Sequence, residues 1–131
     1  MNIYIAGRYS RRDEFRQVRD KLIKRGHTVT SRWLDENEPL QSQMGQHSSE
    51  WYRETQHVDL VDVARADSML FFAEDPLVGT PRGGRHVEFG FALALGRAMY
   101  VIGPRENVFH YNPTVIHYDS LEDFLALTYG C

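Results

Sequence analysis

A chain of 131 residues with 42% hydrophobic and 25% charged residues has the composition of one globular domain. Its 15 basic and 18 acidic residues give a net charge of −3, which disfavours nucleic acid as a partner because duplex binders usually have a basic excess. The single cysteine, Cys131, permits no intrachain disulfide, and the first apolar run is too short for a signal peptide or a membrane span. We therefore expect one domain over residues 1–131, a cytoplasmic location and no membrane partner.

The first half of the chain alternates between strand and helix patterns. A β-prone run predicts a strand over Asn2–Ala6, and apolar residues at helical spacing predict a helix over Ser10–Arg25, with Ser10 as its N-cap. Gly26 is expected to end this helix. A second strand is predicted over His27–Leu34, and after a long polar loop a second helix over Ser48–Ala66.

The second half continues the alternation. Ser68–Ala73 is a continuous apolar run, which is typical of a strand buried on both faces of a parallel sheet. A helix is predicted over His86–Gly96. The remaining elements are strands over Ala98–Gly103 and Val115–Tyr118 and a closing helix over Leu121–Thr128. The order predicts an α/β fold, a doubly wound, flavodoxin-like, five-stranded parallel sheet with helices on both faces.

Ligands of such sheets bind beyond the carboxyl ends of the strands, where the strand order reverses. The loops at those ends are Gly7–Tyr9, Asp75–Gly84 and Gly103–Asn107. The second of them is glycine-rich and leads into a helix, an arrangement whose backbone amides bind anions. We therefore expect the functional site at this edge of the sheet.

Several familiar chemistries lack their residues in this loop. The segment 79–88 has no lysine followed by Ser or Thr, as a phosphate-binding Walker loop requires, and no dinucleotide fingerprint. His86-Val87-Glu88 matches half of a zinc deaminase signature, but the Pro-Cys-x-x-Cys half is missing. No Gly-x-Ser-x-Gly elbow is present either. We expect no metal and no cofactor.

The remaining candidate is the carboxylate of Glu88, which is predicted in the first turn of a helix. Such a glutamate can simply complement the helix dipole. A catalytic role is favoured because the helix that follows is apolar, so a buried carboxylate there needs a task. Tyr4 on the first strand and Asp59 on the second helix are predicted to project toward the same point, and Gly90 would let the helix lie close to the sheet or to a ligand.

Three blocks of the sequence resemble the nucleoside 2-deoxyribosyltransferases and the related deoxynucleoside 5′-monophosphate N-glycosidases. Ile3–Gly7 looks like the opening strand of that family with its tyrosine. Asp59-Leu60 followed by Ala66–Leu70 looks like its acidic helix running into the third strand. Arg82–Gly96 looks like its nucleophile loop and helix. The resemblance covers nearly the whole chain and implies the flavodoxin-like fold and action on a small-molecule nucleoside or nucleotide.

The resemblance implies catalytic roles for three residues. Glu88 would be the nucleophile that forms a covalent glycosyl-enzyme, Tyr4 the hydroxyl that orients its carboxylate, and Asp59 a group that handles the sugar or a proton on the base. A carboxylate suits this chemistry because breaking an N-glycosidic bond develops positive charge at the anomeric carbon. A protonated base leaves more easily, so Asp59 or Asp75 is expected to be a general acid.

The loop before Glu88 departs from the transferase pattern. Arg82 stands where transferases of free nucleosides have an acidic residue, which favours a 5′-phosphate substrate and hydrolysis over base exchange. The expected substrate-binding residues at the strand ends are Gly7, Arg8, Asp75, Arg82, Gly83, Gly84, Arg85 and His86. Early basic residues, Arg8 and Arg11 among them, either face a phosphate or form the solvated face of a helix.

Members of the family complete their sites with residues of a neighbouring subunit near the C-terminus. The candidates here are Asn107, His110 and Asn112, and we expect a homo-oligomer with composite sites; a surface loop is the alternative for this segment. Two other functions are open on the same residues. One is a non-catalytic nucleotide-binding or sensing module, and the other is a glycohydrolase of NAD-like dinucleotides.

Overall fold

A computed structural model describes residues 1–36, 47–75, 77 and 83–128. They form one parallel sheet in the order β2-β1-β3-β4-β5. The strands are β1 (Asn2–Ala6), β2 (Thr28–Val29), β3 (Ser68–Phe72), β4 (Ala98–Ile102) and β5 (Val115–Tyr118). This order is that of the doubly wound, flavodoxin-like fold, with the reversal between β1 and β3. The predicted fold class is confirmed.

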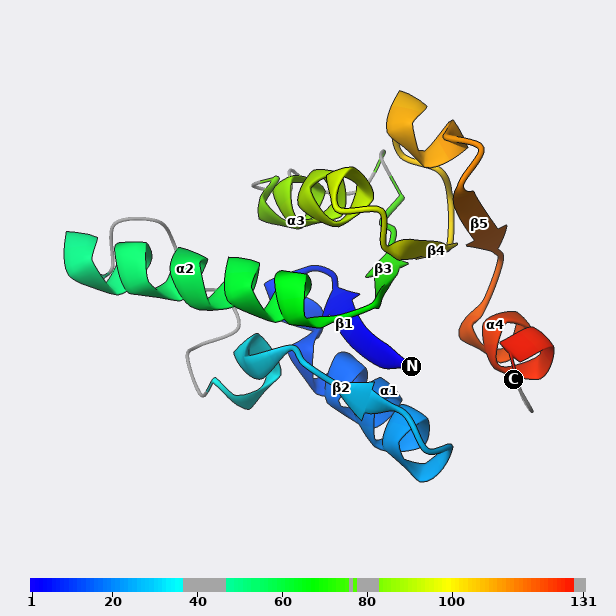
Figure 1. Cartoon of the computed structure of the whole chain (residues 1–131), viewed down its shortest axis with the longest axis horizontal. Coiled ribbons are helices and arrows are strands. Elements are labelled where there is room, and N and C mark those ends of the chain that lie inside the picture. Colours follow the sequence, from blue (N-terminus) through cyan, green and yellow to red (C-terminus); the bar gives the residue numbers. More distant parts are fainter. Residues whose placement is uncertain (37–46, 76, 78–82, 129–131) are drawn as a thin grey trace.

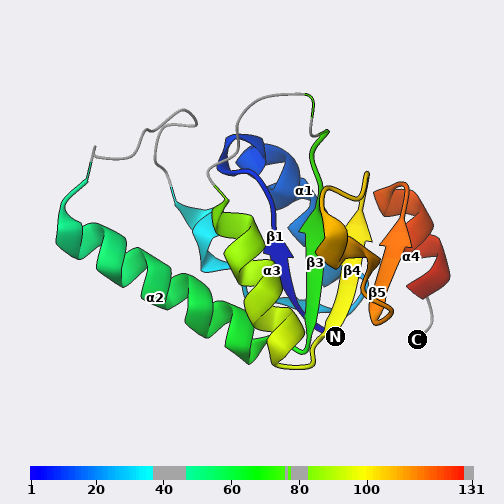
Figure 2. The same ribbon diagram turned by 90° about the horizontal axis from the view of Figure 1, so that it is seen from above.

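Four α-helices cover the two faces of the sheet (Figures 1 and 2). They are α1 (Arg12–Lys24), α2 (Ser49–Arg65), α3 (Gly84–Ala94) and α4 (Leu121–Thr128), and 3-10 turns lie at η1 (Tyr9–Arg11), η2 (Arg32–Asp35) and η3 (Val108–Tyr111). Helices α2 and α3 lie on one face, and α1 and α4 on the other (Figure 2). None of the helices in the described ranges is long and apolar enough to cross a membrane.

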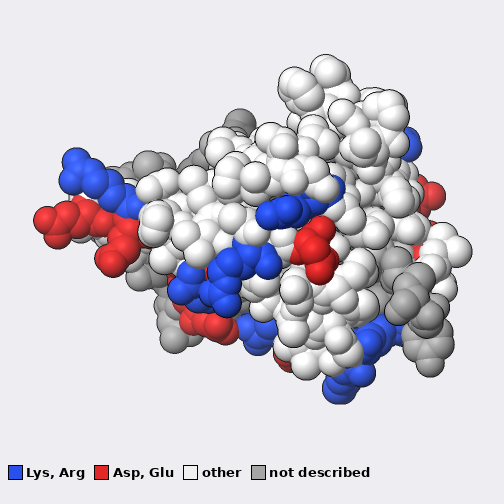
Figure 3. Space-filling view, in the orientation of Figure 1, with Lys and Arg blue, Asp and Glu red and all other residues white. Residues whose placement is uncertain are grey.

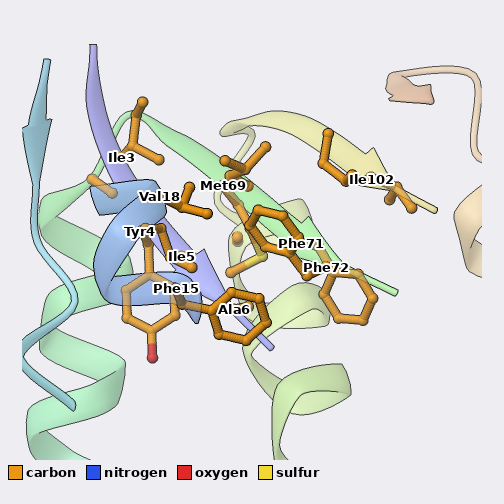
Figure 4. Packing of buried hydrophobic residues seen from close by; sticks show 14 of the residues in the cluster. Ile3, Tyr4, Ile5, Ala6, Phe15, Val18, Met69, Phe71, Phe72 and Ile102 are labelled. Carbon is orange, nitrogen blue, oxygen red and sulfur yellow. The ribbon is translucent and has the colours of Figure 1, made fainter. Parts of the chain in front are cut away.

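The core follows the alternation of side chains along β1 and β3. Every residue of β3 is buried, as the sequence predicted for a central strand. Phe71 packs against Phe89 of α3 at 5.3 Å between ring centroids, whereas Phe72 packs against Phe15 of α1 at 4.7 Å. Tyr4 is fully buried, and its ring extends from β1 with the hydroxyl at the outer end (Figure 4). One face of the sheet thus presents a polar atom toward α2 and α3.

The second predicted strand is mostly wrong. Residues Thr28–Val29 pair with β1, but the chain then turns into η2 instead of continuing to Leu34. The reason lies in β1, whose next amide, that of Ile5, donates to the side-chain Oγ of Ser31 at 2.6 Å. Because this donor is taken by a side chain, the backbone ladder ends and the chain is free to bury Trp33 in the core.

Helix ends differ from prediction at two places. Ser10 does not cap α1; it lies inside η1, and α1 begins at Arg12 without a side-chain cap. Gly26 does end α1 in the left-handed conformation with φ of 88°, as predicted. Ser48 caps α2 by accepting from the amide of Trp51 at 3.1 Å.

Helix α3 begins earlier than predicted, and this changes the position of Glu88. Gly83, with φ of 87°, is its N-cap, so Glu88 follows the first turn, which contains no acidic residue. The dipole explanation for Glu88 is weakened accordingly, since the effect falls off within the first turn. The expectation that Gly90 lets the helix approach the sheet is also wrong, because Gly90 is exposed and an added Cβ would meet no atom within 4 Å; its approach to a ligand stays a prediction.

Candidate active site at the ends of strands β1 and β3

The centre of the candidate site is a hydrogen bond between two elements far apart in sequence. The Tyr4 hydroxyl on β1 donates to Oε2 of Glu88 on α3. Tyr4 is fully buried and Glu88 partly buried. Helix α3 packs on β1 and β3, between which the strand order reverses, so this contact adjoins the place where ligands bind in the fold.

Asp59 lies on α2 and acts electrostatically on both of these groups. Its charge raises the pKa of Glu88 and that of Tyr4. Its Oδ1 is buried and has no hydrogen-bond partner among the described residues. A buried carboxyl oxygen without a partner is costly and needs a reason, such as a ligand that supplies the missing contact.

The protonation of the three groups follows from burial. Burial raises the pKa of Glu88 to about 8, against the hydrogen bond from Tyr4, which lowers it. Burial, then the charges of Glu36 and Asp62, raises the pKa of Asp59 to about 7, and Arg32 opposes them. Burial, then the charge of Glu88, holds the pKa of Tyr4 well above its usual value. Tyr4 therefore remains a donor, and the two carboxyls titrate near neutral pH.

This arrangement can perform acid–base and nucleophilic chemistry. A carboxylate fixed by a donor on a neighbouring strand is oriented for attack, and a second carboxyl that holds its proton near neutrality can give it to a leaving group. Carboxyls with displaced pKa values in one place are a recognised mark of an active site. In the described part of the chain, no group of three or more His, Cys, Asp or Glu side chains is placed to hold a metal ion.

A buried ion pair joins the first turn of α3 to the loop after β4. The guanidinium of Arg85 is bound by both carboxylate oxygens of Glu106, and the two side chains are 4% and 7% exposed. Glu106 also accepts from the amide of Glu74 at 3.1 Å. Arg85 is therefore engaged inside the protein rather than presented to a ligand. Gly83 and Gly84 stand at the start of the helix, where an added Cβ would meet nothing within 4 Å.

Two histidines adjoin this ion pair. Nε2 of His86 lies 3.8 Å from Oε1 of Glu106, and burial, with the charge of Arg85, lowers the His86 pKa. His110 is 1% exposed and accepts from the Glu106 amide through Nδ1 at 3.0 Å. Burial lowers the pKa of His110 to about 4, so its ring is neutral. His110 is thus a core residue of this chain, whereas His86 remains partly accessible.

The other candidates near the C-terminus serve local turns. Asn107 caps η3 by accepting from the amide of Phe109 at 2.9 Å, and its Nδ2 lies 3.4 Å from Nδ1 of His86. Asn112 accepts from the amide and hydroxyl of Thr114 at 2.9 and 2.8 Å. The structure therefore brings Asn107, but not Asn112, into contact with another residue of the predicted set.

The loop after β1 is held by packing. An added Cβ on Gly7 would lie 2.3 Å from the Phe15 ring, so this glycine is required by the core. Arg11 is bound to Glu14 and to Glu74 at 2.7 and 2.8 Å. Arg8, in contrast, forms no ion pair with another residue of the described ranges. Of the two arginines considered for a phosphate, Arg8 is the one available.

Two predicted residues lie in the loop after β3. Asp75 is exposed, and its Oδ1 accepts from the amide of Leu77 at 2.9 Å, which makes a local turn. Asp59, rather than Asp75, is therefore the carboxyl placed with Glu88. Arg82 lies outside the described residues.

Sequence reasoning missed two features of α2. Asp62, one turn after Asp59, is 1% exposed and binds Arg32. Trp51, about 12 Å before Asp59 along the helix, stacks on His47 at 3.7 Å between ring centroids. The pattern of apolar and polar residues along α2 does not indicate that Asp62 is buried. The one available signal is the spacing of Asp59 and Asp62, which at i and i+3 lie on the same side of a helix that faces the core.

A groove of about 260 Å³ lies on the opposite face, between α1 and α4. Phe72 and Ile102 are among its lining residues, and Arg11 at its edge is already paired with Glu14. The groove is separated by the sheet from Glu88, so it is not part of the candidate site.

Comparison with known proteins gives structural neighbours but no sequence match. No protein-family model and no curated protein sequence matches the chain. A 2-deoxyribosyltransferase from Bacillus psychrosaccharolyticus superposes with a TM-score of 0.71 at 18% identity, over 95% of this chain and 90% of the other. The CMP N-glycosidase BcmB of Clostridium botulinum superposes with a TM-score of 0.57 at 15% identity, over 97% of both chains. Both are of the kinds that the sequence resembles, and at these identities they establish a shared fold.

Proposed function

We propose that this chain is an enzyme that cleaves or exchanges the N-glycosidic bond of a deoxynucleoside or deoxynucleotide. The observation that carries the proposal is the Tyr4–Glu88 hydrogen bond at the reversal of strand order, with Asp59 within electrostatic range. The fold shared with a 2-deoxyribosyltransferase and a CMP N-glycosidase supports the same reaction class. Neither neighbour by itself assigns a role to any residue of this chain.

In the proposed reaction a carboxylate oxygen of Glu88 bonds to the anomeric carbon. The bond from that carbon to the base nitrogen breaks, and its electron pair goes to the base. Asp59 gives its proton to the departing base, directly or through the substrate, so the base leaves neutral. Water then gives a proton to the Asp59 carboxylate and bonds to the anomeric carbon, and the bond from that carbon to Glu88 breaks. The sugar leaves, and both carboxyls return to their starting forms; attack by a second base, which would likewise lose a proton to Asp59, would give a new nucleoside instead.

A substrate with a 5′-phosphate is favoured over a free nucleoside. Arg8 lacks an ion-pair partner in the described ranges, and α3 begins at Gly84 after a glycine N-cap, which gives its N-terminus exposed amides of the kind that bind anions. Arg82, by its position in the sequence, would add a second cation. Hydrolysis is also favoured over base exchange, because Arg82 stands where transferases of free nucleosides have an acidic residue.

The direct test is incubation with a panel of deoxynucleosides and their monophosphates, with and without an acceptor base. We expect free base from the monophosphates, and loss of this activity in Glu88→Gln. Glu54→Gln, which changes an exposed carboxylate on α2, is the matched control. Full activity of Glu88→Gln would refute the proposal. Tight binding without turnover would favour a nucleotide-binding module, and nicotinamide release from NAD a dinucleotide glycohydrolase.

We propose further that the chain forms a homo-oligomer with composite sites and acts in the cytoplasm. Exposed apolar side chains support association: Val108, Phe109 and Tyr111 of η3 are 74%, 63% and 68% exposed. The surface over η3 is largely without charged residues (Figure 3). If each site takes Asn107 from a neighbouring subunit, Asn107→Ala should lose base release, and mixing it with inactive Glu88→Gln should restore activity. No recovery in a mixture shown by light scattering to exchange subunits would contradict composite sites.

A further inference from the structure

Arg32 stands beside two aspartates of α2 but is bound by one of them. Its Nε and Nη2 lie 2.9 and 2.8 Å from Oδ1 of Asp62, and its backbone amide donates to Oδ2 of Asp62 at 3.0 Å. Thr30 donates from its hydroxyl to the Asp62 carbonyl at 2.8 Å, which fixes this stretch against α2. Asp62 is 1% exposed and Arg32 is 53% exposed, so the arginine is held at its inner edge only.

Asp59 is the aspartate that Arg32 does not bind. Residues three apart on a helix lie about 5 to 6 Å from each other at Cβ, so the arginine that reaches Asp62 is close to Asp59 as well. Its charge does act on Asp59, since it opposes the rise of the Asp59 pKa. Yet the buried Oδ1 of Asp59 has no hydrogen-bond partner within the described ranges.

We propose that Asp62 is a positioning residue that holds Arg32 away from Asp59, so that Asp59 keeps its proton and its free oxygen for the substrate. If Arg32 turned to Asp59, the pair would be an ordinary ion pair, and Asp59 would neither donate a proton nor receive a contact from a ligand. The buried carboxylate of Asp62 prevents this, because it accepts from three donors of Arg32, which are the backbone amide, Nε and Nη2. The effect of Asp62 on the protonation of Asp59 does not depend on the proposed function; only its consequence for catalysis rests on that function.

Within the described ranges, the titratable and charged groups that act on Asp59 or on which it acts come from four elements. They are Tyr4 of β1, Arg32 of η2 with Glu36 at its C-terminal end, Asp62 of α2, and Glu88 of α3. Arg32 is the one cation in this set, and the other members are acidic or neutral. Where Arg32 is placed therefore decides whether Asp59 is ionised at neutral pH.

The experiment is a titration of Asp59 by NMR of ¹³C-labelled aspartate carboxyls, with the signal assigned from an Asp59→Asn spectrum. We expect Asp62→Asn to lower the Asp59 midpoint by about 1 to 3 pH units, in part because the Asp62 charge that raises the Asp59 pKa is lost and in part because the released Arg32 turns to Asp59. The double variant Arg32→Gln/Asp62→Asn lacks the released arginine, so its midpoint should lie well above that of Asp62→Asn and below that of Arg32→Gln only by the effect of the lost Asp62 charge. Arg32→Gln alone, a change at a half-exposed side chain, should not lower the midpoint.

Each outcome decides the proposal. A midpoint that is unchanged or raised in Asp62→Asn, one that is as low in the double variant as in Asp62→Asn, or one that falls in Arg32→Gln would overturn it. If Asp62→Asn does not fold, Arg32→Gln still tests the proposal, because a fall of the Asp59 midpoint in that variant contradicts it. The titration uses no substrate, so a lack of base release would refute the proposed function but would leave the result of the titration unchanged. Where base release is found, the basic limb of the pH dependence of its kcat/KM should move to lower pH in Asp62→Asn and move back in the double variant. A merely structural role of Asp62 would not produce this shift.

Discussion

Replacing Tyr4 by phenylalanine removes one oxygen and leaves the buried ring in place. The hydroxyl is the hydrogen-bond donor to Glu88, and it opposes the burial that raises the pKa of Glu88 to about 8. In Tyr4→Phe the carboxylate loses this donor. The charged form of Glu88 is then less stable, and its pKa rises further.

The size of the effect follows from the strength of the bond. A hydrogen bond to a charged group contributes about 1.5 to 3 kcal/mol, and about 1.4 kcal/mol corresponds to one pKa unit. Loss of the Tyr4 donor therefore raises the Glu88 pKa by about 1 to 2 units. At neutral pH, the ionised fraction of Glu88 falls roughly tenfold to a hundredfold, and kcat/KM for base release should fall with it.

The assay is the pH dependence of kcat/KM for base release, with Tyr118→Phe on the opposite face of the sheet as the matched control. We expect the acid limb of Tyr4→Phe to move to higher pH, so that activity is partly regained in alkaline buffer. The control should keep the wild-type limb. An acid limb that stays in place, with activity lowered equally at every pH, would mean that Tyr4 does not support the charge of Glu88.

Two further predictions concern stability. Gly7→Ala should lower the free energy of unfolding by about 1 to 3 kcal/mol, because the new Cβ would lie 2.3 Å from the Phe15 ring. Gly90→Ala should raise the free energy of unfolding by about 0.5 to 1 kcal/mol, because its new Cβ would meet nothing within 4 Å and alanine favours the helix. Equal effects of the two variants in urea unfolding would contradict the packing argument. Glu106→Gln should cost about 3 to 5 kcal/mol because it leaves the buried Arg85 charge unpaired. Urea unfolding of Arg85→Met/Glu106→Leu should recover most of this loss, and no recovery would mean that the ion pair itself supplies stability.

Much of the fold was predictable because its elements are marked by local pattern. The apolar run that became β3 and the glycine that ends α1 were read from sequence with their correct roles. The second strand was not, because its end is set by a contact between Ser31 and the amide of Ile5. These two residues are 26 positions apart in the chain. Neither the alternation of a strand nor the 3.6-residue repeat of a helix indicates a contact over that distance.

The site divides in the same way. Tyr4, Asp59 and Glu88 were predicted together, and the structure brings all three within electrostatic range. The glycine-rich loop suggested that Arg85 faces a ligand, yet it is buried against Glu106. Sequence reasoning can identify a cation near an anion-binding loop, but the partner that neutralises it lies in the loop after β4 and is known only once the sheet order is fixed.

The raised pKa values of Glu88 and Asp59 constrain how the proposed reaction can run. Attack needs Glu88 ionised, and departure of the base is helped by Asp59 in its protonated form. Because burial raises the pKa of Glu88 to about 8 and that of Asp59 to about 7, a proton can reside on either carboxyl near neutral pH, and the productive form has it on Asp59. A substrate that takes a hydrogen bond from Asp59, or places positive charge beside Glu88, moves the proton to Asp59, so the pair is poised to convert on binding.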